Sequence, residues 1–304
     1  MNKKDIRTVI DTQEITIDIN NLNTNKLQER ESVEEHRLLK AIKYGDNLNI
    51  KNSKVKLVIK IHNIFKEKDK EHYISSLSEY KNIFENILKN IDVEDMDKVY
   101  NERVDIAIDM DIDYVTNFKK LLYFFCLVTA HKSDINKWLT INLKTLKPNT
   151  IKLDTSSLDI SFYDKAFESE GKAEYKTRLE FRFKRLKNYS LEKYLDKLIM
   201  LLKDIDNNIS YIEEVMINKL IELYQEQLQR YNNKVSLTDF VKQYNTFIFN
   251  TNILKELYKK FCNGKYEYWI NDFRKKYKID LISFAEINNF KKDCIRSIKQ
   301  YKRS

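Results

Sequence analysis

The chain has 304 residues, of which 42% are hydrophobic and 33% are charged, and its formal net charge is +9. This length is sufficient for two domains with hydrophobic cores. No apolar run approaches the roughly 20 residues that a membrane-spanning helix requires, which predicts no membrane segment. The opening MNKKDIRTVIDT lacks the apolar core of a secretory signal, and three widely spaced cysteines predict neither a zinc site nor disulfides. We therefore expect a cytoplasmic protein.

The first 50 residues predict a lead-in strand and helix. Glu14 to Ile19 is typical of an edge strand, and Asn25 to Tyr44 is typical of a helix. Beyond them, Val55 to Ile61 predicts a further strand, and a helix is expected near His72 to Ile91.

The segment Val104 to Asp113 alternates strictly between apolar and other residues, which predicts a half-buried strand. Its second face carries four carboxylates, those of Asp105, Asp109, Asp111 and Asp113. Such a row is costly unless solvent, a cation or basic neighbours offset the repulsion. A metal-dependent phosphodiester site is one such arrangement, and the solvated face of an ordinary antiparallel sheet is the alternative. For Asp111 and Asp113, capping of the next helix is the stronger interpretation.

Two further strand segments follow in the chain. Ile151 to Lys165 predicts two short strands, and a loop that contains Gly171 then returns as a hairpin into Thr177 to Lys184. In this last strand the apolar positions Leu179, Phe181 and Phe183 would enter a core, and Arg178, Glu180 and Arg182 would line the opposite face.

Three strand segments follow one another along the chain: VDIAIDMD from Val104, the segment that ends in Tyr163, Asp164 and Lys165, and RLEFR from Arg178. Their order and character resemble the nicking domain of rolling-circle replication initiators from small plasmids and filamentous phages. The resemblance covers about residues 50 to 190. It implies an α+β fold in which helices pack on an antiparallel sheet. It also implies an endonuclease that nicks one strand of origin DNA and starts rolling-circle replication.

The resemblance also implies site residues. Asp105 or Asp109 would hold Mg²⁺ or Mn²⁺ together with Glu180, provided that their strands lie side by side. Lys165 and Arg178 would neutralise the scissile phosphate, and the alternative is that they pair with the carboxylates. Many initiators bind metal through a His-hydrophobic-His motif, which is absent here, because no two of the four histidines are separated by a single residue. This difference places the chain among carboxylate-only initiators or outside the catalytic group.

The nucleophile in the family is a tyrosine, which we expect on a helix beyond Glu180. Tyr224 is the predicted nucleophile because of its distance from Glu180. The other candidates are Tyr189, Tyr194, Tyr211 and Tyr231. Each of these tyrosines is also explained as a residue of an amphipathic helix that packs against the core.

The positive charge lies in the later part of the chain. Residues 181–304 hold 25 Lys and Arg against 15 Asp and Glu, whereas residues 1–180 hold 30 against 31. Helical periodicity and a candidate N-cap at Ser236 predict helices at Leu191 to Ile205, Ile212 to Leu228, Ser236 onward, Asn250 to Phe261, Tyr266 to Tyr277 and Leu281 to Tyr301. Clustered basic charge favours nucleic-acid binding. A basic helical surface that merely reflects lysine-rich codon usage is the alternative.

We therefore predict a lead-in over residues 1–50, an α+β nicking domain over 51–188 and a basic helical DNA-binding domain over 189–304. The predicted DNA contacts are Arg274, Lys275, Lys276, Lys278, Lys291, Lys292 and Arg296. The expected partner is the replication origin, with a host helicase and a homodimer as further partners. A non-catalytic initiator or regulator that binds origin repeats and recruits host replication proteins is the main alternative, and a structural protein with a basic surface is the third.

Overall fold

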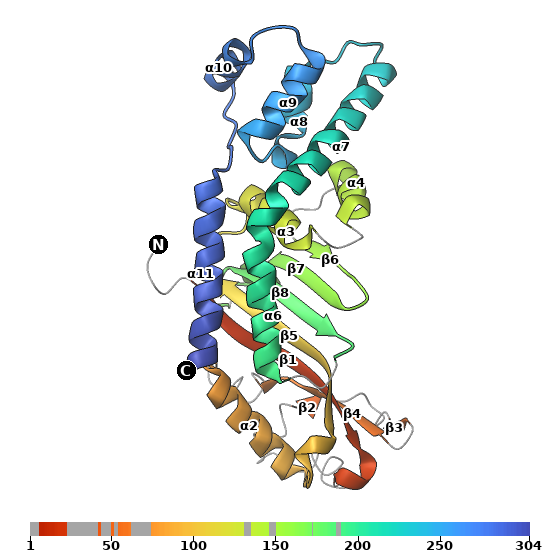
Figure 1. Ribbon diagram of the computed structural model, residues 1–304, viewed down its shortest axis with the longest axis vertical. Helices are drawn as coiled ribbons and strands as arrows, with labels where there is room; N and C mark the ends of the chain where they lie inside the picture. Colours follow the sequence, from red (N-terminus) through yellow and green to blue (C-terminus); the bar gives the residue numbers. More distant parts are fainter. Residues whose placement is uncertain are drawn as a thin grey trace. The chain divides into compact units, whose positions relative to one another are not determined.

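The computed structural model describes residues 6–22, 42–43, 50–51, 54–61, 74–130, 135–145, 150–171, 173–186 and 190–304 (Figure 1). The contact pattern divides the chain into two units. The first comprises residues 1–113, 154–200 and 293–304, and the second comprises residues 114–153 and 201–292. The units are thus interleaved in sequence, whereas the predicted domains were consecutive.

An antiparallel sheet forms the centre of the first unit. Its strands follow the order β2-β4-β1-β5-β8-β7, and β3 pairs with β4. The strands are β1 (Ile6–Asp18), β2 (Ile42–Lys43), β3 (Ile50–Lys51), β4 (Lys54–Ile59), β5 (Val99–Met110), β7 (Leu158–Asp164) and β8 (Thr177–Lys184). The predicted α+β class, an antiparallel sheet with packed helices, is confirmed.

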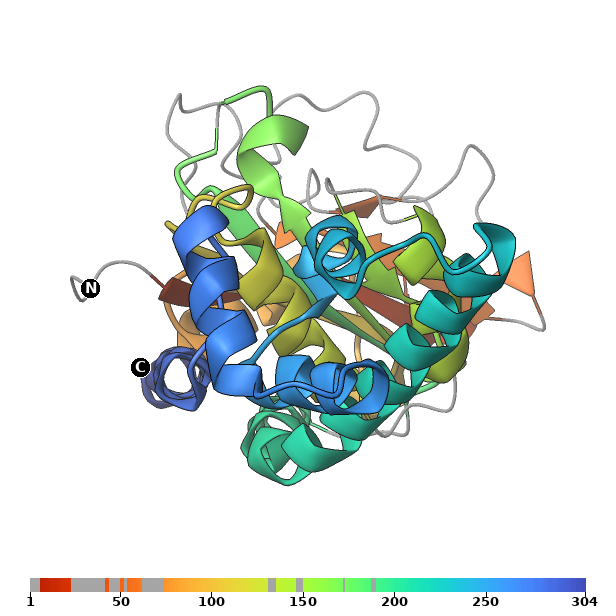
Figure 2. The same ribbon diagram turned by 90° about the horizontal axis from the view of Figure 1, so that it is seen from above.

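Helices cover the apolar face of this sheet. They are α2 (Leu77–Asn90), the first part of α6 (Leu191–Lys203) and the last part of α11 (Phe284–Arg303). The Phe183 ring on β8 lies 5.4 Å from the Tyr194 ring on α6, and the Tyr80 hydroxyl on α2 donates to Gln13 on β1 at 2.9 Å. The view from above shows α6 and α11 on one side of the sheet and the short helix α5 (Lys165–Glu168) on the other (Figure 2). The apolar side chains of β5 and β8 are therefore buried beneath the longer helices.

The boundaries correct two predictions. β1 lies between β4 and β5, so the prediction of an edge strand at Glu14 to Ile19 was wrong. Its polar residues, which are typical of an edge, are instead bonded within the unit, as the contact of Gln13 with Tyr80 illustrates. β5 ends at Met110, and Asn117 occupies the N-cap position of α3 (Phe118–Thr129), so neither Asp111 nor Asp113 is the N-cap residue of this helix.

The other strand predictions are confirmed. β8 has the predicted bounds, and β4 and α2 lie at the predicted places. β7 and β8 form the predicted hairpin, and the turn after α5 contains Gly171 at φ +79°. This φ lies in the left-handed region, which glycine adopts without steric cost. Asp164 begins α5, because its side chain accepts a hydrogen bond from the Phe167 amide at 2.9 Å.

The second unit is mostly helical. It contains α3, α4 (Ile135–Thr145), β6 (Thr150–Leu153), α7 (Ile209–Arg230), α8 (Leu237–Gln243), α9 (Thr251–Phe261) and α10 (Tyr266–Lys276). The boundary between the units falls within α6 and within α11. The helices predicted beyond Leu191 are confirmed, and the Ser236 hydroxyl caps α8 by accepting from the Asp239 amide at 3.1 Å.

Gly264, in the turn between α9 and α10, is closely approached by a tyrosine side chain. A Cβ at this position would lie 2.6 Å from the Tyr258 hydroxyl oxygen. Within the ranges described above, no helix is both long and apolar enough to cross a membrane. Ile42 and Lys43 form β2, so the predicted helix Asn25 to Tyr44 was wrong at its end, and the rest of it, residues 25–41 and 44, lies outside the described residues. All four histidines (His36, His62, His72 and His131) and Tyr189 also lie outside them.

Candidate functional site

The register of β5 and β8 places the predicted acidic residues on one face of the sheet. Asp105 faces Arg182, Ala107 faces Glu180, and Asp109 faces Arg178. Because side chains alternate between the two faces of a strand, Glu180 lies on the same face as both aspartates. The two strands are therefore side by side, as the resemblance required. We call this surface the polar face.

The polar face extends across four strands. On β7, Asp159, Ser161 and Tyr163 face the charged row of β8. On β1, Arg7 faces Asp109, and a β-bulge between Ile10 and Thr12 follows. The ionisable members of the polar face used below are Arg7, Asp11, Glu14, Arg103, Asp105, Asp109, Asp159, Tyr163, Lys165, Arg178, Glu180 and Arg182.

Asp109 is fully buried, and cations surround it. Arg178 makes a bidentate contact, from Nε to Oδ1 at 2.6 Å and from Nη2 to Oδ2 at 3.0 Å. Arg7 Nη2 and Lys165 Nζ donate to Oδ2 at 3.2 and 3.4 Å. Burial alone would raise the pKa of Asp109, but the charge and hydrogen bonds of Arg178, with Lys165 and Arg7, outweigh it and lower that pKa. Arg178 and Lys165 thus pair with the carboxylate, as the alternative interpretation had it.

Asp105 has a similar environment. Arg103 Nε donates to its Oδ1 at 2.7 Å, Arg103 Nη2 donates to its Oδ2, and Arg182 Nε lies 3.2 Å from both oxygens. Arg103 also donates to Glu14 at 2.7 Å. The hydrogen bonds to Asp105 raise the pKa of Arg103, so this guanidinium stays charged. The repulsion expected from an acidic row is therefore offset by basic neighbours, which lie on β5 itself and on the adjacent strand β8.

Glu180 differs from the two aspartates. It lies between the small residues Ala107 and Ser161 of the neighbouring strands, and its side chain is 13% exposed. Arg182 Nη2 donates to Oε1 at 3.3 Å, and the Tyr163 hydroxyl donates to Oε2 at 3.2 Å. Burial raises the pKa of Glu180, and the negative charges of Asp11 and Asp105 raise it further. Glu180 and Asp109 thus have pKa values displaced in opposite directions on one face.

These carboxylates, as arranged, do not fit a magnesium or manganese ion. Such ions require several oxygen ligands that converge on one point. The oxygens of Asp105 and Asp109 already accept hydrogen bonds from guanidinium groups. In the described part of the chain, no group of three His, Cys, Asp or Glu side chains is placed to hold a metal ion.

Tyr224, the predicted nucleophile, packs in the second unit. It is 5% exposed, its hydroxyl donates to the Val235 carbonyl at 2.9 Å, and its ring lies 4.8 Å from that of Phe240 and 4.6 Å from that of Phe261. Burial raises the pKa of its hydroxyl. This environment agrees with the interpretation of Tyr224 as an amphipathic-helix residue. Among the other candidates, Tyr194 is buried, whereas Tyr211 and Tyr231 are exposed.

The predicted DNA contacts fall into two groups. Arg274, Lys275, Lys276 and Lys278 are exposed at the end of α10 and just beyond it. Two of the predicted contacts on α11 are already in ion pairs, because buried Lys291 pairs with Asp206 and Arg296 pairs with Asp293. Lys292 is exposed.

Sequence reasoning missed the contribution of β1 to the polar face. Arg7 and Asp11 lie in the polar phase of the alternation that begins at Ile6, which was a usable signal. The β-bulge then shifts the register, so the alternation is not continuous along the strand. Comparisons with family models, with curated proteins and with solved structures gave no match to this chain.

Proposed function

We propose that this chain is a replication initiator that binds origin DNA and nicks one strand at the polar face. The proposal depends on one observation, which is that Glu180 lies on the same face as Asp105 and Asp109, opposite the small residue between them. An acid of raised pKa, a tyrosine hydroxyl and several guanidinium groups therefore adjoin one another. This set of groups suits attack on a phosphodiester.

Each group has a role in such a reaction. A tyrosine oxygen forms a bond to phosphorus, and the bond from phosphorus to the 3′ oxygen of the preceding nucleotide breaks. Glu180 accepts the proton of the attacking hydroxyl, a task for which its raised pKa is suited. Arg178 and Arg182 bind the phosphate oxygens and give up part of their contact with Asp109 and Asp105 to do so. The products are a phosphotyrosyl bond and a free 3′-hydroxyl, which takes up a proton.

Two tyrosines are candidates for the nucleophile. Tyr224 is the residue predicted from its distance along the chain, and in the structure its hydroxyl is bonded to a backbone carbonyl. Tyr163 has its hydroxyl on the polar face, in contact with Glu180. The chemistry requires that the hydroxyl reach both a base and the phosphorus, so mapping the modified tyrosine decides between them.

The test is an assay for a covalent adduct. The protein is incubated with a supercoiled plasmid that carries its coding sequence and the flanking DNA, with Mg²⁺, with Mn²⁺ and with a chelator. We expect nicked circles that retain protein in denaturant, and Glu180→Ala should abolish them. Asp111→Ala is the matched control, because Asp111 lies beyond β5, is 48% exposed and pairs with Lys176. Absence of nicking by the wild type, or full nicking by Glu180→Ala, would contradict the proposal.

A non-catalytic initiator that binds origin repeats is the second candidate. It is favoured by the ion pairs of Asp105 and Asp109 with arginines. Carboxylates paired in this way can have a structural role in the fold without taking part in a reaction. This candidate predicts sequence-specific binding without a divalent ion and without a covalent adduct. The same assay, combined with a binding measurement, therefore separates the two functions.

A further inference from the structure

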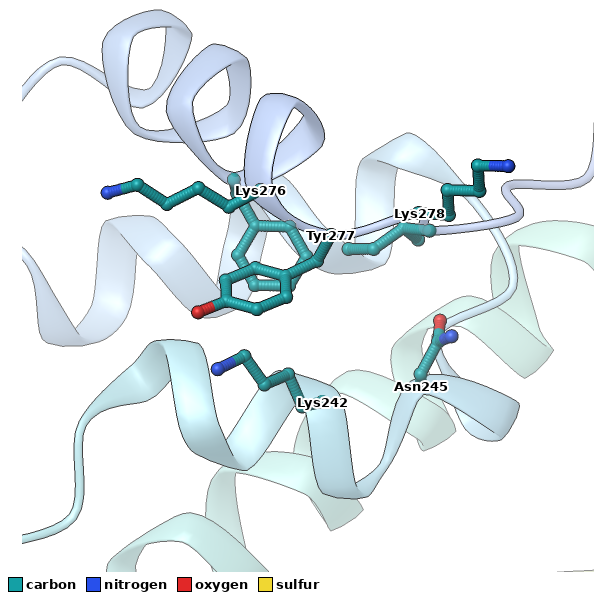
Figure 3. A pocket seen from close by; sticks show the side chains of 7 residues that line it. Lys242, Asn245, Lys276, Tyr277 and Lys278 are labelled. Atoms are coloured by element: carbon teal, nitrogen blue, oxygen red, sulfur yellow. The ribbon is translucent and has the colours of Figure 1, made fainter.

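A cavity of about 380 Å³ in the second unit is lined by basic and aromatic side chains (Figure 3). Its walls come from α8, from the short helix η7 (Asn245–Phe247), from the end of α10 and from the segment that follows α10. The lining residues are Lys242, Asn245, Phe273, Lys276, Tyr277, Lys278 and Ile279. No acidic residue lines this cavity, so an anion would meet no repelling carboxylate in its wall.

Lys242 is held in place before any ligand arrives. Its Nζ lies 3.7 Å from the centre of the Tyr277 ring, and Figure 3 shows the side chain reaching toward that ring from α8. Nζ also lies 3.3 Å from Asp239, the residue bonded to the N-cap of the same helix. A cation ordered in this way loses less side-chain entropy when it binds an anion.

Asn245 presents an amide donor at the same cavity. Lys119 Nζ donates to its Oδ1 at 3.0 Å. Because the oxygen of the amide is thus bonded to a cation, its Nδ2 is the group left to donate to a ligand. A neutral donor beside cations is a common means of binding a phosphate oxygen.

Lys276 and Lys278 extend to opposite sides of Tyr277 (Figure 3). Lys276 pairs with Asp272 at 2.9 Å, whereas Lys278 has no carboxylate within ion-pair distance in the described part of the chain. The surrounding segment, residues 230–278, contains 11 Lys and Arg against 4 Asp and Glu. The local potential is therefore positive.

Figure 3 shows Lys276 and Lys278 extending in opposite directions and Lys242 reaching toward Tyr277, so the three cations are spread around the cavity. A single terminal phosphate would be best held by converging donors, whereas successive phosphates along one strand match separated cations. We propose that this cavity is a backbone-binding subsite, in which Lys242, Asn245 and Lys278 hold phosphates of a DNA strand and so fix α10 on the DNA. The proposal rests on the proposed function in origin binding. It adds Lys242, Asn245 and Tyr277 to the DNA contacts predicted on α10.

The test compares two double variants that lose the same charge. Lys242→Gln/Lys278→Gln removes two cations of the subsite. The control, Lys255→Gln/Lys260→Gln, removes two exposed cations of α9 outside the cavity. Affinity for a fluorescent DNA duplex is measured by anisotropy at several salt concentrations. The subsite variant should lower affinity about tenfold or more and reduce the slope of log K against log salt by about 1.8, which is about 0.9 for each phosphate contact. The control variant should lose less than about threefold in affinity.

The outcomes separate the subsite from the function. If the wild type binds no DNA, the proposed function fails and the subsite with it. If the wild type binds DNA but both double variants lose the same affinity, origin binding stands and the subsite is overturned. A competition experiment with thymidine monophosphate tests whether the cavity binds free nucleotides instead. If the mononucleotide displaces the duplex at a lower nucleotide concentration than a single-stranded oligonucleotide does, the cavity is a free-nucleotide site and the strand-binding proposal is overturned. A Tyr277→Leu variant, which removes the ring beneath Lys242, should weaken duplex binding more than Tyr268→Leu on exposed Tyr268.

Discussion

At the scale of single residues, the polar face is a place where charge is buried and compensated. Removing an ionised carboxylate from water costs several kcal/mol unless partners and hydrogen bonds satisfy it. Asp109 meets this requirement with one bidentate arginine and two further cations. Loss of the acid would leave Arg178, itself buried, without its main counter-charge.

We predict that Asp109→Asn lowers the free energy of unfolding by about 3–5 kcal/mol, the cost of leaving a buried partner uncompensated. The measurement is urea unfolding at pH 7. Asp111→Asn is the control on the same segment, and it should cost less than about 1 kcal/mol because its pair with Lys176 is exposed. Similar losses in the two variants would show that the pairs around Asp109 contribute little.

Glu180 should behave in the opposite way. Its folded-state pKa is raised above the ordinary 4.5. Between these two pKa values the unfolded chain has released the proton while the folded chain keeps it, so stability falls as pH rises through this window. Glu180→Gln should therefore raise the free energy of unfolding at pH 7 by about 0.5–2 kcal/mol, as other single stabilising changes do.

The gain from Glu180→Gln should vanish below pH 4.5, where the carboxyl is protonated in both states. Thermal unfolding at pH 4 and pH 7 measures both values. The same variant should lose nicking, and stability gained with activity lost is the signature of a residue placed for chemistry. A variant that is destabilised at pH 7 would instead make Glu180 a structural member of the face.

At the scale of elements, strands with strict alternation were predictable and strands with irregularities were not. β8 was predicted with its true bounds, because apolar and charged residues alternate throughout Thr177–Lys184. β5 was found, but its start at Val99 was missed, since the opening residues VYNER do not alternate. β1 was assigned to an edge because its polar residues resemble exposed ones.

The candidate site was predictable to the same extent. Two-residue periodicity together with adjacent strands was enough to place Asp105, Asp109 and Glu180 on one face. The arginines that neutralise the aspartates were harder to identify. Arg7 reaches Asp109 only through the register of β1 and β5, which depends on a β-bulge. Pairing across distant segments is a property of the assembled sheet and leaves no local pattern in the sequence.

The cap of α8 gives a prediction at this scale. Ser236→Ala removes the hydroxyl that accepts from the Asp239 amide, and it should lower the free energy of unfolding by about 1 kcal/mol. Ser236→Asn should retain most of the stability, because asparagine is an equally good N-cap. Urea unfolding measures both variants. Equal losses would show that the hydroxyl acts through its contact with the Asp239 carboxylate instead.

At the scale of the whole molecule, the two units share helices. α6 buries Leu195 and Leu198 in the first unit and Leu202 in the second. α11 likewise buries Ile287 and Phe290 in the second unit, and Ile298 in the first. A helix whose two halves belong to different cores links the stability of these cores, because its backbone hydrogen bonds form cooperatively.

Two buried cysteines can report this linkage. Cys294 lies in the first unit and Cys126 in the second, and burial raises the pKa of both thiols, so neither should react in the folded protein. In a Cys262→Ser background, Cys126→Ala leaves a probe of the first unit and Cys294→Ala leaves a probe of the second. We predict that both thiols become reactive toward Ellman's reagent at the same urea concentration, apart from the difference in global stability that the two substitutions cause. To correct for that difference, each labelling midpoint is compared with the unfolding midpoint measured by circular dichroism on the same variant, and the two midpoints should agree. Labelling of one thiol well before the helical signal is lost would show that the units unfold separately, and that α6 and α11 break at the boundary between them.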